Sequence, residues 1–304
     1  MQASDDFNPV PGQAVILAQG LSRVLAPNPS PMTYRGTNTY LLGETDIAVI
    51  DPGPLSDAHL SAILDALQPN QRISHIFVTH THLDHSPLAA PLAIHTGAPI
   101  LAFGGPQAGR SAVMTELAQN GFAGGGEGID MDFRPDIELE DTACISADDW
   151  TLEVIHTPGH LGNHIALAWG DVCFTADHVM GWASSLVSPP DGDLTDFMAA
   201  CHRLRAREWS VFHPGHGAPV TEPNNRLEWL IQHRLSRESQ ILDELIKGPA
   251  TARQLALRIY IDTPGALLPA AERNVFAHLV DLTGKAQVAP VETLSAQSEF
   301  IRLS

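Results

Sequence analysis

The stretch that decides the fold and the chemistry of this chain is Val78-Thr79-His80-Thr81-His82-Leu83-Asp84-His85. Three histidines and one aspartate fall within six residues, directly after a predicted strand that ends at Val78. Core packing does not require this composition, because a buried polar group without a partner costs several kcal/mol. Imidazole nitrogen and carboxylate oxygen are ligands that zinc accepts. The stretch therefore predicts a metal site at a strand end, and a solvated polar strand end is the alternative.

Three later segments carry further donors of the same kinds. They are His156-Thr157-Pro158-Gly159-His160, Phe174-Thr175-Ala176-Asp177 and His213-Pro214-Gly215-His216-Gly217. Each follows or ends a predicted strand, and α/β folds place their chemistry at the carboxyl ends of strands. A Pro-Gly pair tightens the backbone just before His160 and just before His216. We expect these donors to share one centre with the first four.

The first three quarters of the chain predict short strands that alternate with helices. The run Pro27–Pro31 is a loop, because three prolines remove three backbone donors. Five glycines between Asn120 and Gly128 predict a mobile loop or flap. Two β-rich halves with helices between them indicate an α/β protein with a layered αββα sandwich. The expected strands are 14–18, 24–26, 40–42, 47–50, 73–78, 100–103, 137–139, 152–156, 164–169, 172–175 and 210–212, and the expected helices are 56–67, 88–95 and 194–205.

The composition changes at Asn225, which predicts a catalytic domain over residues 1–225 and a linker helix with a winged-helix-like domain over 226–304. A long amphipathic helix, two further helices and two strands give the order of a winged-helix module. Arg273 and Lys285 are scattered and form no basic stripe, so we interpret this part as a packing or substrate-gating element. The expected elements are helices 227–246, 252–259 and 266–282 and strands 286–291 and 299–303.

Charge and cysteine content narrow the function classes. The chain has 304 residues and a formal net charge of −18. Residues 1–235 hold 10 Lys and Arg against 27 Asp and Glu, a net of −17, so the acidity lies in the larger domain. An acidic body repels polyanions, which argues against a general nucleic-acid binder. Three widely spaced cysteines, an acidic N-terminus without secretory features and no long apolar run indicate a cytoplasmic protein without a membrane partner.

The combined motifs resemble those of the metallo-β-lactamase-fold hydrolases, and all seven metal-ligand positions of the dinuclear members are matched. The resemblance implies an αββα sandwich with a hydroxide held between two Zn²⁺ ions, Mn or Fe being alternatives. It implies that His80, His82 and His160 bind one metal and that Asp84, His85 and His216 bind the other. It also implies that Asp177 bridges the two metals. The implied metal ligands are His80, His82, Asp84, His85, His160, Asp177 and His216.

One of these ligands and two further residues receive additional roles. We expect Asp84 both to bind a metal and to pass a proton to the leaving group. The resemblance suggests that His164 is catalytic and serves an oxyanion, and filling a polar gap at a strand start is the alternative. Asp51, in an Asp-Pro-Gly turn, matches an aspartate that orients a histidine ligand, and a turn cap is the alternative. We interpret His156, His178 and His213 as supporting or structural residues.

Nearly the whole chain resembles the β-lactamase-like protein 2 group, whose members carry a winged-helix tail. The quoted segments are Gly36-Thr37-Asn38-Thr39-Tyr40-Leu41, the His160 turn and Ile231-Gln232-His233-Arg234. The animal branch of that group is regarded as a zinc-dependent endoribonuclease that acts on single-stranded RNA, so RNA cleavage is an alternative function here.

We predict a metal-dependent hydrolase that acts on a small ester, thioester or lactone. Single-stranded RNA is the alternative substrate. A non-catalytic nucleic-acid-binding regulator is the third hypothesis, and the complete ligand set argues against it. A homo-oligomer is compatible with the sequence.

Overall fold

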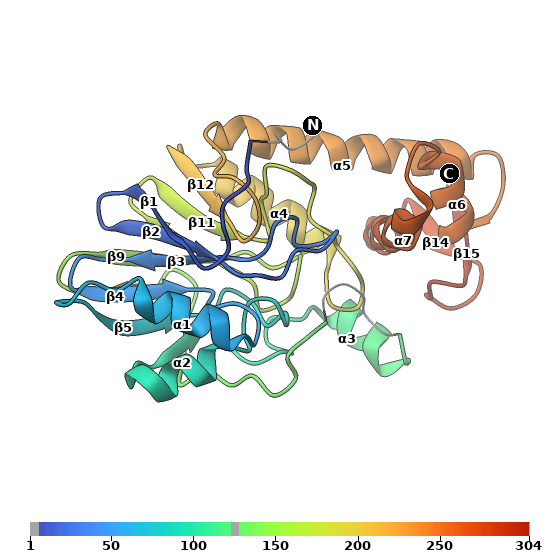
Figure 1. Ribbon diagram of the computed structural model, residues 1–304. Helices are drawn as coiled ribbons and strands as arrows, with labels where there is room; N and C mark the ends of the chain where they lie inside the picture. Colours follow the sequence, from blue (N-terminus) through green and yellow to red (C-terminus); the bar gives the residue numbers. More distant parts are fainter. Residues whose placement is uncertain (1–5, 123–127, 304) are drawn as a thin grey trace.

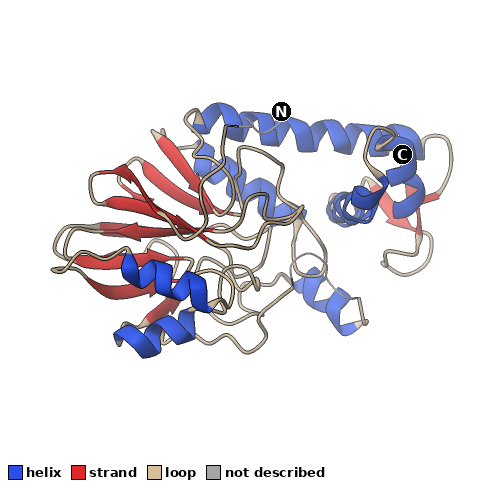
Figure 2. Ribbon diagram, viewed as in Figure 1, coloured by secondary structure: helices blue, strands red, loops and turns tan. Residues whose placement is uncertain are grey.

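The computed structural model describes residues 6–122 and 128–303. Two β-sheets lie face to face, and helices cover the outer face of each sheet, so the larger part of the chain is an αββα sandwich (Figures 1 and 2). A smaller helical part lies at one end of a long helix and contains the C-terminus (Figure 1). The structure confirms the predicted fold class.

The first sheet has seven strands in the order β1-β2-β3-β4-β5-β6-β7. Neighbouring strands are antiparallel from β1 to β4 and parallel from β4 to β7. The strand bounds are β1 (Ala14–Ala18), β2 (Leu21–Leu25), β3 (Asn38–Leu42), β4 (Asp46–Ile50), β5 (Arg72–Phe77), β6 (Ile100–Ala102) and β7 (Ile137–Glu138). β2 begins at Leu21 and not at Val24, because its pairing with β1 and β3 continues through Ser22 and Arg23.

The second sheet has five strands in the order β12-β11-β10-β9-β8. Only β11 and β12 are parallel among its pairs, and the other pairs are antiparallel. The strand bounds are β8 (Cys144–Ser146), β9 (Thr151–His156), β10 (Ile165–Trp169), β11 (Val172–Ala176) and β12 (Val211–Pro214). The site segments predicted from the sequence follow β5, β9 and β12 or end β11, so both sheets contribute to one edge of the sandwich.

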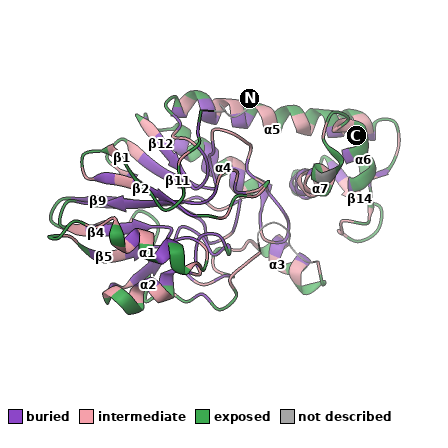
Figure 3. Ribbon diagram, in the orientation of Figure 1, coloured by how far each residue is buried: buried purple, intermediate pink, exposed green. Residues whose placement is uncertain are grey.

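Three apolar clusters hold the layers of the sandwich together. One lies between the sheets and includes the buried residues Tyr40, Phe77, Leu152 and Phe174. Much of the ribbon of the two sheets has the colour of buried residues in Figure 3. A second packs α1 (Asp57–Asp65) and α2 (Ala89–Thr96) on the first sheet, and a third packs α4 (Leu194–Arg205) and α5 (Pro223–Leu245) on the second. The burial of these apolar side chains is the main stabilising contribution to the fold.

The C-terminal part consists of helices on a small sheet with the order β13-β15-β14. A fourth apolar cluster joins the end of α5 to these elements, and Met114 and Leu117 from the larger part pack into it. Phe122 also contacts Phe276, with ring centroids 5.2 Å apart. The two parts therefore share a core. The bounds are β13 (Ala250–Thr251), α6 (Ala252–Ile259), the 3-10 turn η1 (Gly265–Leu267), α7 (Leu268–Gly284), β14 (Val288–Pro290) and β15 (Glu299–Arg302).

Several elements differ from the sequence-based expectation. Helix α3 (Ala112–Gln119) was not expected; Ser111 caps it by accepting a hydrogen bond from the Met114 N–H, and its apolar face packs on the C-terminal part. Helix α5 begins at Pro223 and not at Leu227, because proline suits the first turn of a helix. The predicted flap Asn120–Gly128 falls partly outside the described residues. The predicted domain boundary lies in the first turn of α5 and stays a prediction. No described helix has the length and apolar character to cross a membrane.

Candidate metal centre

Three histidine nitrogens meet at one point of the sandwich edge. His80 and His82 lie in the turn after β5, and His160 lies in the turn after β9. The Nδ1 atom of His82 is 3.0 Å from the Nε2 atom of His80 and 3.0 Å from the Nε2 atom of His160. Tetrahedral nitrogen ligands at 2.0–2.1 Å from zinc are about 3.3 Å apart. The three imidazoles therefore fit one side of a metal coordination sphere.

Four more donors form a second group beside the first. The Nε2 atom of His216 lies 3.1 Å from Asp84 Oδ2 and 3.3 Å from His85 Nε2. Asp177 Oδ1 lies 3.5 Å from His85 Nε2. Within each group, all donor atoms lie within 4.8 Å of one another, and all seven side chains are buried. The first group is His80, His82 and His160, and the second is Asp84, His85, Asp177 and His216.

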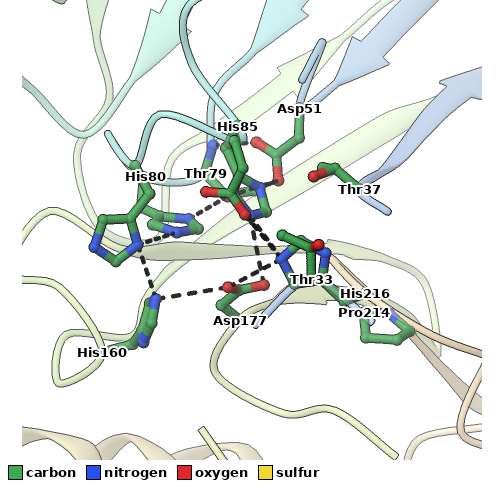
Figure 4. Close-up of polar contacts among 12 residues, drawn as sticks. Thr33, Thr37, Asp51, Thr79, His80, His85, His160, Asp177, Pro214 and His216 are labelled. Atoms are coloured by element: carbon green, nitrogen blue, oxygen red, sulfur yellow. Dashed lines mark hydrogen bonds and ion pairs between the residues drawn. The ribbon is translucent and has the colours of Figure 1, made fainter. Parts of the chain in front are cut away.

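Asp177 lies between the two groups. Its Oδ2 atom is 3.6 Å from the Nε2 atom of His160 and 3.3 Å from the Nε2 atom of His216 (Figure 4). A carboxylate at this place has an oxygen available to each group. The structure thus brings together all seven residues that the sequence predicted as metal ligands, with Asp177 at the position expected of a bridge.

The outer nitrogen of three of these histidines is held by a fixed acceptor. His160 Nδ1 donates to the Leu186 carbonyl at 2.8 Å, and His216 Nδ1 donates to the Gly36 carbonyl at 3.1 Å. His85 Nδ1 lies 2.9 Å from Asp51 Oδ2. Each contact places the proton on the outer nitrogen and leaves the Nε2 atom facing the centre, an arrangement that raises the basicity of a ligand histidine.

Asp51 is itself fixed by the residue that precedes the first histidine. Its Oδ1 atom accepts a hydrogen bond from the Thr79 N–H at 2.8 Å, and its Oδ2 atom accepts one from the Thr79 hydroxyl at 2.8 Å (Figure 4). The backbone of Asp51 has φ = 52°, a value uncommon for a residue with a Cβ. These contacts hold the His85 ring in one orientation, as expected if Asp51 orients a predicted metal ligand.

The electrostatics of the second group favour replacement of protons by a metal. Burial alone would lower the pKa of His216, but Asp177 and Asp84 outweigh it and raise that pKa to about 10. Burial would also lower the pKa of His85, but the nearby carboxylates, Asp84 most of all, raise it well above its usual value. Burial would raise the pKa of Asp84, and the histidines His85 and His216 lower it instead. Two carboxylates therefore hold two imidazolium protons where a cation fits.

Two glycines of the Pro-Gly pairs permit close approaches that a side chain would block. A Cβ on Gly215 would lie 2.4 Å from Asp177 Oδ1 and 2.7 Å from a ring carbon of His85. A Cβ on Gly159, where φ is +133°, would lie 2.3 Å from the backbone of Phe197. The glycines therefore let the ligand turns pack against the centre and against α4.

The donor set matches a pair of divalent cations. Three imidazoles suit zinc, and a mixed set of imidazole and carboxylate suits zinc, manganese or iron. The Oδ1 atoms of Asp84 and Asp177 are buried and have no hydrogen-bond partner among the described residues. A buried carboxylate oxygen without a partner is costly, and a cation would satisfy it. The residues therefore fit a dinuclear centre.

Comparison with known proteins agrees with this geometry. Residues 32–229 match the family described as the Metallo-beta-lactamase superfamily. The chain belongs to this superfamily. Residues 251–293 match the Beta-lactamase associated winged helix domain, so the C-terminal part is a winged-helix domain. The chain is thus a hydrolase of the metallo-β-lactamase superfamily with a site for divalent metal.

Individual relatives cover the chain to different extents. It is 32% identical to a protein of Drosophila melanogaster named Beta-lactamase-like protein 2 homolog, over 93% of this chain and 94% of that one. It is 30% identical to the Atrochrysone carboxyl ACP thioesterase AgnL7 of Paecilomyces divaricatus, over 72% of this chain and 62% of the other. A crystal structure of a beta-lactamase domain protein from Burkholderia ambifaria shares the fold, with a TM-score of 0.81 and 20% identity over 98% of this chain and 96% of that one.

A cavity of about 260 Å³ opens onto the metal centre of this superfamily member. His82, Asp84, His160 and Asp177 line part of it, which we call the metal end. The loop that follows Asp177 also lines the cavity, and the part lined by the winged-helix domain is called the far end. The volume is near the lower end of the range for small-molecule sites, about 300 Å³ upward.

The side wall of the cavity is fastened by the C-terminal helices. Arg234 of α5 donates hydrogen bonds to the Ser185 carbonyl at 2.5 Å and to Asn274 Oδ1 at 3.0 Å. Asn274 Oδ1 of α7 also accepts a hydrogen bond from the Val187 N–H at 3.3 Å. Leu186, the carbonyl of which orients His160, lies between these two anchored residues. The winged-helix domain thus helps to hold a ligand histidine in place.

The other histidines singled out in the sequence take different places. His164 is fully buried, its Nδ1 atom lies 2.8 Å from the Thr157 hydroxyl, and it does not line the cavity. Its catalytic role stays a prediction. His156 stacks on Phe103 with ring centroids 3.8 Å apart, and the Nε2 atom of His178 lies 3.5 Å from Cys201 Sγ, as expected of supporting residues.

Sequence reasoning anticipated the contact of Asp51 with a histidine and missed the other contacts that hold the predicted ligands. The carbonyl groups of Leu186 and Gly36 act through backbone atoms, so their side chains give no signal. Arg234 lies in a segment that carries the family resemblance, but nothing in that segment indicates what its side chain contacts, and Asn274 resembles an ordinary surface residue of an amphipathic helix. Thr79 directly precedes His80, and a hydroxyl beside a predicted ligand was the one signal that could have been used.

Proposed function

We propose that this chain is a dinuclear zinc hydrolase that cleaves a small ester, thioester or lactone. The observation that carries the proposal is the position of the cavity, one end of which is formed by four of the seven metal-site residues. A substrate in this cavity would have its scissile carbonyl next to the metal site. Two divalent cations bound there would lower the pKa of a water molecule and polarise the carbonyl.

The chain supplies the groups that handle the proton. Asp84 lines the cavity beside the place where the scissile bond would lie. It is therefore placed to take up a proton and to deliver it to the leaving group. Asp177, held between His160 and His216, fixes the spacing of the two halves of the centre.

The side chains that line the cavity favour a small substrate over RNA. Its charged lining residues other than histidine are Asp84, Asp177 and Asp191, and no lysine or arginine lines it in the described part of the chain. A nucleic-acid backbone is bound mainly through cationic side chains. The relative named a thioesterase provides an independent reason to include thioesters among the substrates.

Cleavage of single-stranded RNA is the second candidate, and one feature favours it. Trp182 lines the cavity and stacks on Tyr34 with ring centroids 5.1 Å apart. The guanidinium of Arg35 lies 5.0 Å from the Tyr34 ring centre. Aromatic faces of this kind stack on bases in single-strand binders.

Incubation of the zinc-loaded protein with two substrate classes separates the candidates. One set contains p-nitrophenyl esters, acyl thioesters and lactones, and the other is a fluorescently labelled single-stranded RNA. We expect release of nitrophenol or thiol and intact RNA, with all activity lost after chelation and in His216→Ala. Cleavage of the RNA without turnover of any small substrate would overturn the proposal.

A further inference from the structure

The far end of the cavity is built by residues of the winged-helix domain. Its lining residues come from the end of α6, the turn that follows it and the first two turns of α7. They are Tyr260, Thr263, Leu267, Ala270, Ala271 and Asn274. The active-site cavity is thus closed by a domain separate from the one that holds the metal ligands.

Leu267, the N-cap residue of α7, and three residues of the first two turns of α7 form a single stripe along the cavity. Leu267, Ala270, Ala271 and Asn274 have the spacing i, i+3, i+4 and i+7, which places them on one face of a helix. The first three are apolar, and two of them are alanines. Their small side chains leave room for a ligand next to the helix.

The larger domain lines the cavity with apolar groups as well. Met32, Met180, Trp182 and Leu186 all line it. A group bound between the two domains would therefore meet apolar side chains from both. Such a lining favours a hydrocarbon chain or ring over a charged or strongly hydrated group.

The same end of α7 is the part that a DNA-binding relative of this fold would use. In helix-turn-helix proteins, the N-terminal residues of the second helix of the pair contact bases in the major groove. Here α6 and α7 form that pair, and the first turns of α7 lie against the catalytic cavity. Residues 236–304 also carry 7 Lys and Arg against 8 Asp and Glu, so the domain lacks a net positive charge. The stripe lines the cavity and lacks the basic residues that DNA binding requires.

We propose that the α7 stripe, defined as Leu267, Ala270 and Ala271, is the specificity-determining wall for the apolar arm of an ester or thioester substrate. The inference rests on the proposed function, because it assigns the part of the substrate that lies away from the scissile bond. The apolar arm is either the acyl chain or the chain of the leaving alcohol or thiol. Both have the same chemistry, and substrate series distinguish them.

The test uses the zinc-loaded full chain and two series of substrates. One series is p-nitrophenyl esters with acyl chains from two to ten carbons, and the other is acetyl esters and thioesters with leaving groups of increasing length. Ala270→Leu fills the cavity, and Leu267→Ala enlarges it. Leu257→Ala serves as a matched control, because Leu257 is an exposed residue of α6 outside the cavity lining.

We expect Ala270→Leu to lower kcat/KM for the longest substrates of one series by about tenfold or more, because a pocket discriminates single methylene groups by that order. The shortest substrates and the control are unaffected. Leu267→Ala shifts the preference toward longer chains. Leu267 is 40% exposed, so its truncation leaves the core intact and keeps the test decisive where Ala270→Leu does not fold.

The outcomes separate this inference from the proposed function. The series in which the preference shifts identifies the arm that contacts α7. A wild-type protein that cleaves esters, together with folded variants in which the chain-length profile is unchanged in both series, would overturn the inference and leave the proposed function standing. A wild-type protein that cleaves no ester, thioester or lactone would overturn the proposed function instead.

Discussion

The two ends of the cavity differ in what they are made of and in how their residues are held. The metal end consists of histidines and aspartates, and three of the histidines have their outer nitrogens fixed by a carboxylate or a backbone carbonyl. The far end consists of Tyr260 and Thr263, which precede α7, and of the stripe at the start of α7, in which Leu267, Ala270 and Ala271 are apolar and Asn274 is polar. If the proposed function and the proposed α7 wall both hold, substitutions at one end should leave the property carried by the other end largely unchanged.

The largest effect is expected at Asp177. Asp177→Ala removes the carboxylate between the two groups and should reduce bound zinc from about two per chain to one or none, with loss of activity. Metal analysis by mass spectrometry measures this. Asp171→Ala is the matched control, because Asp171 is exposed in the turn between β10 and β11. Unchanged stoichiometry would refute the bridging position.

The pH dependence of the metal end should be strong and should have a definite sign. The raised pKa values of His85 and of His216, the latter about 10, mean that the metal-free protein holds both protons at neutral pH. At pH values below these pKa values, metal affinity should rise by about tenfold per pH unit for each proton that the metal displaces. Calorimetry in two buffers of different ionisation enthalpy measures the protons released, and a value near zero at pH 7 would contradict this.

Stability without metal should depend on pH in the opposite direction. A raised pKa in the folded state stabilises the protein below the unfolded value of about 6.5, and this contribution is lost as the pH rises through 10. In chelator, the free energy of unfolding should therefore fall between pH 6.5 and 10, as measured by urea denaturation. The zinc-loaded protein lacks these protons, so a fall of equal size in both forms would count against the account.

A smaller effect is expected from the contact that supports His85. Asp51→Asn keeps the shape of the side chain but weakens the interaction with the imidazole, and loss of such a partner costs roughly 10- to 100-fold in metal affinity. Competition with a chromogenic chelator measures the affinity. The control is Asp65→Asn at an exposed position of α1, and equal affinities in the two variants would remove Asp51 from the metal end.

The smallest effect is expected where the two ends meet. Asn274→Ala leaves the buried Arg234 guanidinium and the Val187 N–H without their shared acceptor, which costs about 1–3 kcal/mol of stability. Urea denaturation measures the loss. Metal affinity should change less than in Asp51→Asn, because the Leu186 carbonyl is also positioned by the bond from Arg234 to Ser185. A larger loss of metal affinity would show that the two ends are not separate.

The metal end could be predicted from the sequence because its donors are concentrated in short motifs. His80, His82, Asp84 and His85 lie in one turn, and His160 and His216 each follow a Pro-Gly pair. Strand periodicity placed these motifs at strand ends, and the parallel β11–β12 pair brings two of the ends together. The sandwich followed from the same alternation of strands and helices.

The far end could not be predicted in the same way. Ala270 and Ala271 are common helix residues, and nothing in their local sequence indicates that they face a cavity. Helix α3 was missed for a similar reason, because its eight residues are stabilised by Met114 and Leu117 packing on a domain more than a hundred residues away. Such contacts depend on the assembled fold and leave little local pattern.

Anomalous X-ray diffraction at the zinc absorption edge, from crystals of the zinc-loaded protein, tests the central claim most directly. We expect two peaks, one among His80, His82 and His160 and one among Asp84, His85 and His216, with Asp177 between them. A single peak, or two peaks away from these residues, would contradict it.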